Sequence, residues 1–141
     1  CRTLAGRTKL HTDILRAVRA AVGSEYPIAI RFGACDYLEG GSTTEDIPEA
    51  SRLFADAGAD LLDISGGLSG FMIKGNSQPG WFAELSRPAK KSVQIPVLLT
   101  GGVNSATEAE QLLMDGAADL IGVGRAMLKD PAWAVKALNE V

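Results

Sequence analysis

The chain has few of the residues that build disulfide frameworks, metal centres or membrane spans. Its two cysteines, Cys1 and Cys35, cannot form a disulfide framework, and their spacing matches no metal site. His11 is the only histidine, so no metal or acid–base cluster can be built around a second one. No apolar run reaches the length of a membrane span, and no segment has the pattern of a signal peptide. We therefore expect a cytoplasmic protein with no metal centre and no membrane partner.

An excess of positive charge is also missing. The 14 basic and 17 acidic residues give a net charge of −3, and the basic residues form no stripe along the chain. Proteins that bind nucleic acids or anionic membranes need a concentrated basic surface. The sequence therefore argues against a nucleic-acid partner.

The length of the chain limits its architecture. At 141 residues and 46% hydrophobic composition, residues 1–141 can bury one ordinary core, so we expect a single unit. A complete (β/α)8 barrel takes about 250 residues, so only about half of one would fit. The chain also begins with Cys1 instead of methionine, and we therefore expect a processed or proteolysed piece of a longer protein.

Four short apolar segments with glycine at or after their ends predict the strands of a parallel sheet. They cover residues 27–33, 60–65, 95–102 and 119–125. Strands that are apolar on both faces are typical of a parallel sheet buried on both faces under helices. Five helix patterns alternate with them, and capping-box spacing at 42–45 and 105–108 marks the starts of two helices. Segment 44–61 is also repeated in segment 107–120, so the predicted fold is α/β, with four parallel strands alternating with helices.

The first predicted helix has a regular apolar row. Leu10, Ile14, Val18 and Val22 recur every four residues, and Gly23 follows as a stop signal. We expect this row to face the core.

Four strands allow two architectures. They can form an open three-layer sheet, or they can form half of a (β/α)8 barrel. A half-barrel would leave both edge strands and its inner face unpaired, which favours association. It would then need its missing half, a second copy of the chain, or a substantial rearrangement.

The third and fourth predicted strands end in glycine-rich turns. Gly101 and Gly102 end one strand, and Gly124 followed by Arg125 ends the other. Glycine lets the backbone approach a ligand closely, and arginine supplies a planar positive group that suits a phosphate. Each turn alone could be a tight connection, which every α/β protein requires. Because both turns lie at the carboxyl ends of parallel strands, where ligands bind in such folds, we favour an anion site.

Arg31 interrupts the first predicted strand. A buried guanidinium needs an acceptor, because an unpaired buried charge is very unfavourable. Ala29 and Gly33 leave room on its face for a ligand, whereas Asp63 on the next strand could form an ion pair with it. The residues alone leave both interpretations open.

Four motifs follow one another along the chain: GRTKL at 6–10, IRFG at 30–33, IPVLLTGGV at 95–103 and GAADLIGVGRAMLKDPAW at 116–133. Their order and spacing resemble the C-terminal half of the old yellow enzyme family. Members of that family are NADH:flavin oxidoreductases with an FMN-containing (β/α)8 barrel. The resemblance spans essentially the whole chain and implies the C-terminal half of the barrel.

The resemblance also implies a role for each candidate residue. Arg31 matches the arginine that lies against the pyrimidine edge of the flavin. Gly101, Gly102, Gly124 and Arg125 match the turns that hold the FMN phosphate. The parent enzyme would take hydride from NAD(P)H and pass it to an activated alkene, enone or similar acceptor.

The family's catalytic residues have no counterpart in this sequence. The histidine/asparagine pair that binds the substrate carbonyl and the tyrosine that donates a proton would lie before Cys1. The cysteine cluster of iron–sulfur members would lie after Val141. We therefore expect no catalytic residue in the chain and little or no activity from it alone. The alternatives are a non-catalytic flavin- or phosphate-binding module and an inert structural fragment.

Overall fold

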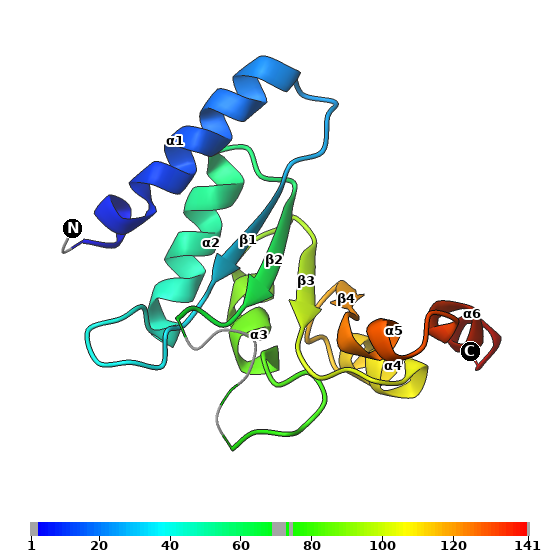
Figure 1. Ribbon diagram of the computed structural model, residues 1–141. Coiled ribbons are helices and arrows are strands. Elements are labelled where there is room, and N and C mark those ends of the chain that lie inside the picture. Colours follow the sequence, from blue (N-terminus) through cyan, green and yellow to red (C-terminus); the bar gives the residue numbers. More distant parts are fainter. Residues whose placement is uncertain (1–2, 69–72, 74, 141) are drawn as a thin grey trace.

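The computed structural model describes residues 3–68, 73 and 75–140, which form a four-stranded sheet accompanied by helices (Figure 1). The strands are β1 (Ala29–Gly33), β2 (Leu61–Ser65), β3 (Val97–Thr100) and β4 (Leu120–Gly122). The helices are α1 (Leu4–Val22), α2 (Ile47–Asp56), α3 (Ala83–Ser92), α4 (Ala106–Met114), α5 (Arg125–Lys129) and α6 (Trp133–Glu140), with a 3₁₀ turn at Thr44–Asp46. The four strands and their alternation with helices are confirmed, and α5 is additional to the five predicted helices.

The strands stand in the sheet in chain order. The order is β1-β2-β3-β4, and every neighbouring pair is parallel. Open doubly wound sheets reverse their strand order at one point, whereas a (β/α)8 barrel adds each strand beside the previous one. The topology is therefore that of a barrel segment, with β1 and β4 at the edges of the sheet.

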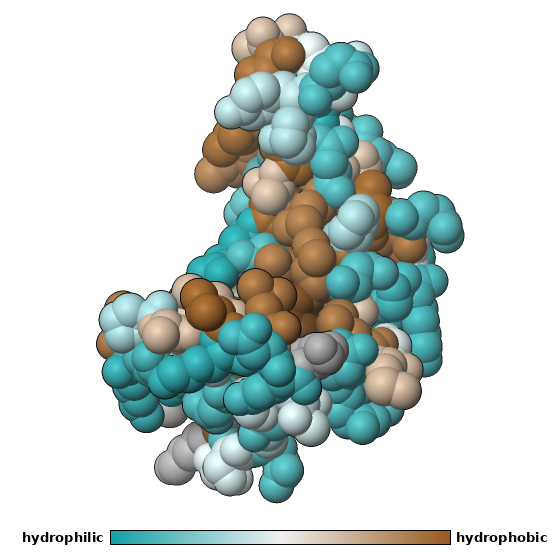
Figure 2. Space-filling view, turned by 90° about the vertical axis from the view of Figure 1, so that its right-hand side faces the viewer, coloured by the Kyte–Doolittle hydropathy of each residue, from teal (hydrophilic) through white to brown (hydrophobic). Residues whose placement is uncertain are grey.

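One face of the sheet carries the core. Leu62 and Ile64 of β2 and Val97 and Leu99 of β3 are fully buried on the helix-covered face. The residues between them on the other face are only half-buried. No second layer covers the inner face within the described residues, so the burial of both faces suggested by the apolar strands is not observed. An open inner face is what the half-barrel architecture predicts. Figure 2 shows hydrophobic side chains gathered across the middle of one side of the molecule, where the surface is hollowed.

Helix α1 packs through a different face from the one that its sequence predicts. Its buried residues are Thr8, Thr12 and Leu15, and its main packing partner is α2. The four aliphatic residues of the predicted row are all exposed: Leu10, Ile14, Val18 and Val22. The expected orientation is wrong because α1 packs on α2 at the β1 edge of the sheet, with no further element beyond it in the described chain (Figure 1). These four residues form an exposed apolar surface, the α1 row.

The two predicted capping boxes have different outcomes. The box at 105–108 is present at the start of α4. The box predicted at 42–45 is shifted by one residue, so that the Thr43 N–H donates to Asp46 Oδ2 at 3.1 Å. The reason is that the Ser42 N–H donates instead to Asp36 Oδ2 at 2.7 Å. The helix region that follows β1 therefore starts one residue later than its sequence suggests.

Candidate functional site

An open hollow of about 550 Å³ lies on the inner face of the sheet, toward the carboxyl ends of the strands. All five predicted site residues line this one hollow: Arg31, Gly101, Gly102, Gly124 and Arg125. The strands β1, β3 and β4 supply them, so residues up to 94 positions apart in the sequence meet because the strands are parallel and in register. A hollow of this size is in the range of small-molecule and cofactor sites.

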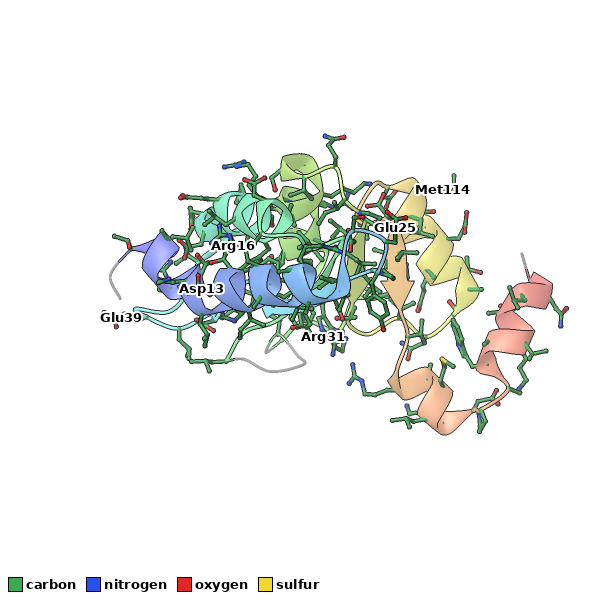
Figure 3. The ribbon with its side chains drawn as sticks, turned by 90° about the horizontal axis from the view of Figure 1, so that it is seen from above. Asp13, Arg16, Glu25, Arg31, Glu39 and Met114 are labelled. Atoms are coloured by element: carbon green, nitrogen blue, oxygen red, sulfur yellow. The ribbon has the colours of Figure 1, made fainter. Side chains whose placement is uncertain are left out.

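Arg31 and Asp63 form an ion pair across β1 and β2. They are register partners, and Arg31 Nε donates to Asp63 Oδ2 at 2.7 Å. The Arg31 side chain is nevertheless 63% exposed, so its charge is not buried as the strand pattern suggested. Figure 3 shows Arg31 projecting away from α2 and α3. The ion pair with Asp63 uses Nε of Arg31, and the two terminal nitrogens of Arg31 make no hydrogen bond within the described residues. An ion pair and a contact with a ligand are therefore compatible with each other.

Asp63 is the acidic member of this pair and is much less exposed than the arginine. Its side chain is 17% exposed, and Oδ1 is buried without a hydrogen-bond donor among the described residues. A buried carboxylate oxygen is normally satisfied, so this atom is a polar position that a ligand or an additional protein segment would complete.

The turn after β3 requires glycine at two successive positions. Gly101 has φ +113° and Gly102 has φ +73°, which are conformations that side chains rarely adopt. A Cβ atom at either position would also lie 2.5 Å from the ring of Trp81. The Gly101 carbonyl accepts hydrogen bonds from the N–H groups of Gly80 at 2.7 Å and Trp81 at 3.3 Å. This turn is therefore fixed by conformation, by packing and by hydrogen bonds.

The turn after β4 is built differently. Gly124 has φ −116°, and a Cβ atom there would meet nothing within 4 Å. Neither the backbone conformation nor internal packing requires glycine at position 124. The absence of a side chain leaves the backbone accessible at the hollow. Arg125 follows as the first residue of α5, and its guanidinium carbon lies 4.8 Å from the centre of the Trp81 ring. Trp81 could not be found from the sequence, because its approach to residues 20 and 44 positions away leaves no local signal.

The loops after β1 and β2 are joined by Asp36. Its two carboxylate oxygens accept hydrogen bonds from the N–H groups of Ser42 at 2.7 Å and Leu68 at 2.8 Å. These bonds favour the charged form and hold the pKa of Asp36 below its usual value. Asp36 therefore fixes the rim of the sheet beside the hollow.

Tyr37 is the one described non-glycine residue with a positive φ, at 54°. Its hydroxyl donates to Glu84 Oε1 at the start of α3. Burial, followed by the bond to Glu84, raises the pKa of the Tyr37 phenol. The contact links the loop after β1 to the helix that follows β2, and it leaves the phenol protonated at neutral pH.

Residues that could hold a metal ion or span a membrane were also sought. Within residues 3–68, 73 and 75–140, no group of three histidine, cysteine, aspartate or glutamate side chains is placed to hold a metal ion. None of the helices in that part of the chain has the length and apolar character needed to cross a bilayer.

Comparison with known proteins identifies a family. The family described as "NADH:flavin oxidoreductase / NADH oxidase" matches residues 4–141. An NADH oxidase of Thermoanaerobacter brockii is 34% identical over 135 residues, which are 93% of this chain and 21% of that protein. An NADPH dehydrogenase of Bacillus cytotoxicus is 31% identical over 141 residues, which are 99% of this chain and 39% of that protein.

Solved structures give the same result for the fold. A 2-naphthoyl-CoA reductase in complex with 2-naphthoyl-CoA superposes with a TM-score of 0.84 at 26% identity, covering 98% of this chain and 22% of that one. The chain thus spans about a fifth to two-fifths of the length of these relatives. The fold is therefore a partial (β/α)8 barrel.

Proposed function

Because the chain belongs to the NADH:flavin oxidoreductase / NADH oxidase family, we propose that it carries the phosphate-binding half of an FMN site. The observation that supports this proposal is the gathering of Arg31, Arg125 and two accessible glycine turns around one hollow. Two arginine cations in one hollow suit a ligand that carries a phosphate and a ring able to take up negative charge.

The residues of the hollow offer groups that suit FMN, namely two guanidinium groups and glycine backbone. The backbone at Gly101, Gly102 and Gly124, with the Arg125 guanidinium, would hold the phosphate. Arg31 would lie against the pyrimidine edge of the ring, where its position is fixed by Asp63. FMN, when bound, supplies hydride transfer between NAD(P)H and an acceptor such as an activated alkene or enone. The chain's own part is to bind and orient the cofactor and to place a positive charge beside its ring.

The hollow contains few groups that could transfer a proton. Its titratable side chains are Arg31, Asp63 and Arg125, and no histidine, tyrosine, cysteine or lysine of the described residues lines it. Arginine does not release its proton in proteins, and Asp63 is already paired. We therefore propose that the chain alone binds the cofactor with little or no turnover. A non-catalytic flavin- or phosphate-binding module is the alternative that the same observation favours.

The chain spans only part of the length of its relatives, so several of its surfaces would be covered in a complete barrel. The open inner face, the edges of β1 and β4 and the exposed α1 row would all be covered in a closed barrel. The partner that completes the barrel is either the missing half-barrel or a second copy of this chain. The activity of the complete enzyme, including its choice between NADH and NADPH, belongs to that assembly.

Flavin titration of the purified chain tests the proposal. FMN and riboflavin have the same ring system, but only FMN has a phosphate, so the ratio of their affinities measures the phosphate site. Arg125→Ala should lower FMN affinity by about tenfold or more, which is the usual effect of losing a hydrogen bond to a charged group. Riboflavin affinity should not change.

Arg16→Ala is the matched control. Arg16 lies on α1, away from the hollow, with 60% of its side chain exposed (Figure 3). The proposal is overturned if the wild-type chain binds neither flavin at millimolar concentration, or if Arg16→Ala weakens FMN binding as much as Arg125→Ala.

A further inference from the structure

Trp81 joins the two turns of the candidate phosphate site. Its ring lies against both Gly101 and Gly102, because a Cβ atom on either glycine would come within 2.5 Å of it. The guanidinium carbon of Arg125 also lies 4.8 Å from the ring centre. One side chain therefore contacts the turn after β3 and the turn after β4 together.

The environment of Trp81 is not that of an ordinary core residue. The side chain is 9% exposed, yet its Nε1 atom is buried without an acceptor among the described residues. A buried donor without a partner is unfavourable, and a phenylalanine would fill much of the same space without this penalty. The indole has one property that phenylalanine has to a smaller degree, which is its strong attraction for a cation over its face.

Stacking suits the task of presenting Arg125 to an anion. A guanidinium that lies over an aromatic ring uses its flat face for that contact, whereas its N–H donors point outward in the plane of the group. A contact of this kind restricts the Arg125 side chain, whose guanidinium carbon lies 4.8 Å from the centre of the Trp81 ring. Fixing a long side chain before the ligand arrives also lowers the entropy lost on binding.

We propose that Trp81 is a positioning residue of the phosphate site. It fixes the Gly101–Gly102 turn with one part of its ring and holds the Arg125 guanidinium over its face, so that both turns are preorganised for a phosphate monoester. This inference rests on the proposed function, since it assigns a role within the same site. Phe82, which lines the hollow and is almost fully buried, packs edge-on against Trp81 with ring centres 6.3 Å apart and so supports the indole.

A double-mutant cycle separates this role from general packing. Trp81→Leu should weaken FMN binding by about five- to thirtyfold, the range expected for a partly buried cation–π contact, and should leave riboflavin binding unchanged. The same substitution should have a smaller effect on FMN affinity in an Arg125→Ala background, where only its contact with the Gly101–Gly102 turn remains to be lost. Trp81→Phe keeps an aromatic face and should recover part of the loss.

Two results of this cycle would overturn the proposal. The first is an equal loss of FMN and riboflavin affinity in Trp81→Leu, which would indicate a structural role only. The second is an unreduced effect of Trp81→Leu when Arg125 has already been replaced.

A measurement without flavin keeps the role of Trp81 testable even if no flavin binds. A failure to bind flavin would count against the proposed function and not against this role. Protons of a side chain over an indole face are shifted upfield, so the Arg125 side-chain resonances should be upfield in the wild-type NMR spectrum. They should return to ordinary values in Trp81→Leu, and inorganic phosphate should shift them in the wild type. Arg125 resonances at ordinary values in the wild type would refute the contact with Trp81. Resonances that do not change when phosphate is added would refute the role of Arg125 in an anion site.

Discussion

Replacing Gly101 by alanine should destabilise the fold by about 2–6 kcal/mol, through two separate effects. A side chain at φ +113° strains the backbone, which costs roughly 1–3 kcal/mol. The new Cβ would also lie 2.5 Å from Trp81 Nε1 and 3.1 Å from a ring carbon of Phe82, and overpacking of this kind costs a further ~1–3 kcal/mol. Since a domain has a total stability of only about 5–15 kcal/mol, the variant should be close to unfolding.

Two other glycines provide matched controls for these effects. Gly116, just after α4, has φ +65° but nothing within 4 Å of a Cβ, so Gly116→Ala should show strain alone, about 1–2 kcal/mol. Gly124 has neither a positive φ nor a neighbour within 4 Å, so Gly124→Ala should change stability by no more than about 0.5 kcal/mol. Because Gly124 lines the hollow, the same variant should still weaken FMN binding.

Urea unfolding of the three variants measures the differences. The expected order of destabilisation is Gly101→Ala, then Gly116→Ala, then Gly124→Ala, with similar slopes against urea concentration. Equal midpoints for Gly101→Ala and Gly124→Ala would refute the reasoning, because they would mean that Trp81 moves aside freely and that the turn is not fixed.

Three further predictions concern the rim, the edge and the core. The pKa of Asp36 is lowered in the folded state, so Asp36 contributes its full stabilisation above the usual aspartate pKa of about 4. That stabilisation is lost as the pH falls from about 4 through the folded pKa. Asp36→Asn should therefore flatten this part of the curve of unfolding free energy against pH. The double variant Leu10→Gln, Ile14→Gln should associate with itself less than the wild type in sedimentation experiments, because both side chains are exposed and apolar. Its unfolding free energy should stay within about 0.5 kcal/mol of the wild-type value. Unaltered association would show that the α1 row is not the contact surface. Leu62→Ala should cost about 2–5 kcal/mol in urea unfolding, because Leu62 is fully buried, and a smaller loss would mean that the core closes around the cavity.

Much of the fold could be predicted because its signals are local. Apolar runs that end in glycine gave the four strands, and the serine–glutamate spacing at 105–108 gave the start of α4. The pairing of Arg31 with Asp63 was one of two open interpretations, and the parallel register makes them direct neighbours.

The errors have a common physical origin. Helical periodicity shows that Leu10 and Ile14 share a face, but it cannot show whether another element lies against that face. The apolar strands suggested that both faces of the sheet are buried for the same reason, because an apolar strand does not show whether this chain supplies a layer to cover it. Only the half-barrel architecture predicted the open inner face. Trp81 was missed because its contacts with Gly101 and Arg125 exist only once three separate segments are brought together.

Few residues are buried in β4, α5 and α6, so the side of the hollow formed by β4 and α5 is held by little buried surface. β4 has three residues, α5 buries only Ala126, and α6 buries none of its described residues. Segments with so little buried surface open more often than the rest of a protein, and hydrogen exchange records that opening. A ligand that joins Arg125 to the turn after β3 would therefore slow amide exchange most strongly in β4 and α5. Exchange at β1 and β2, which are paired over five residues, would change little.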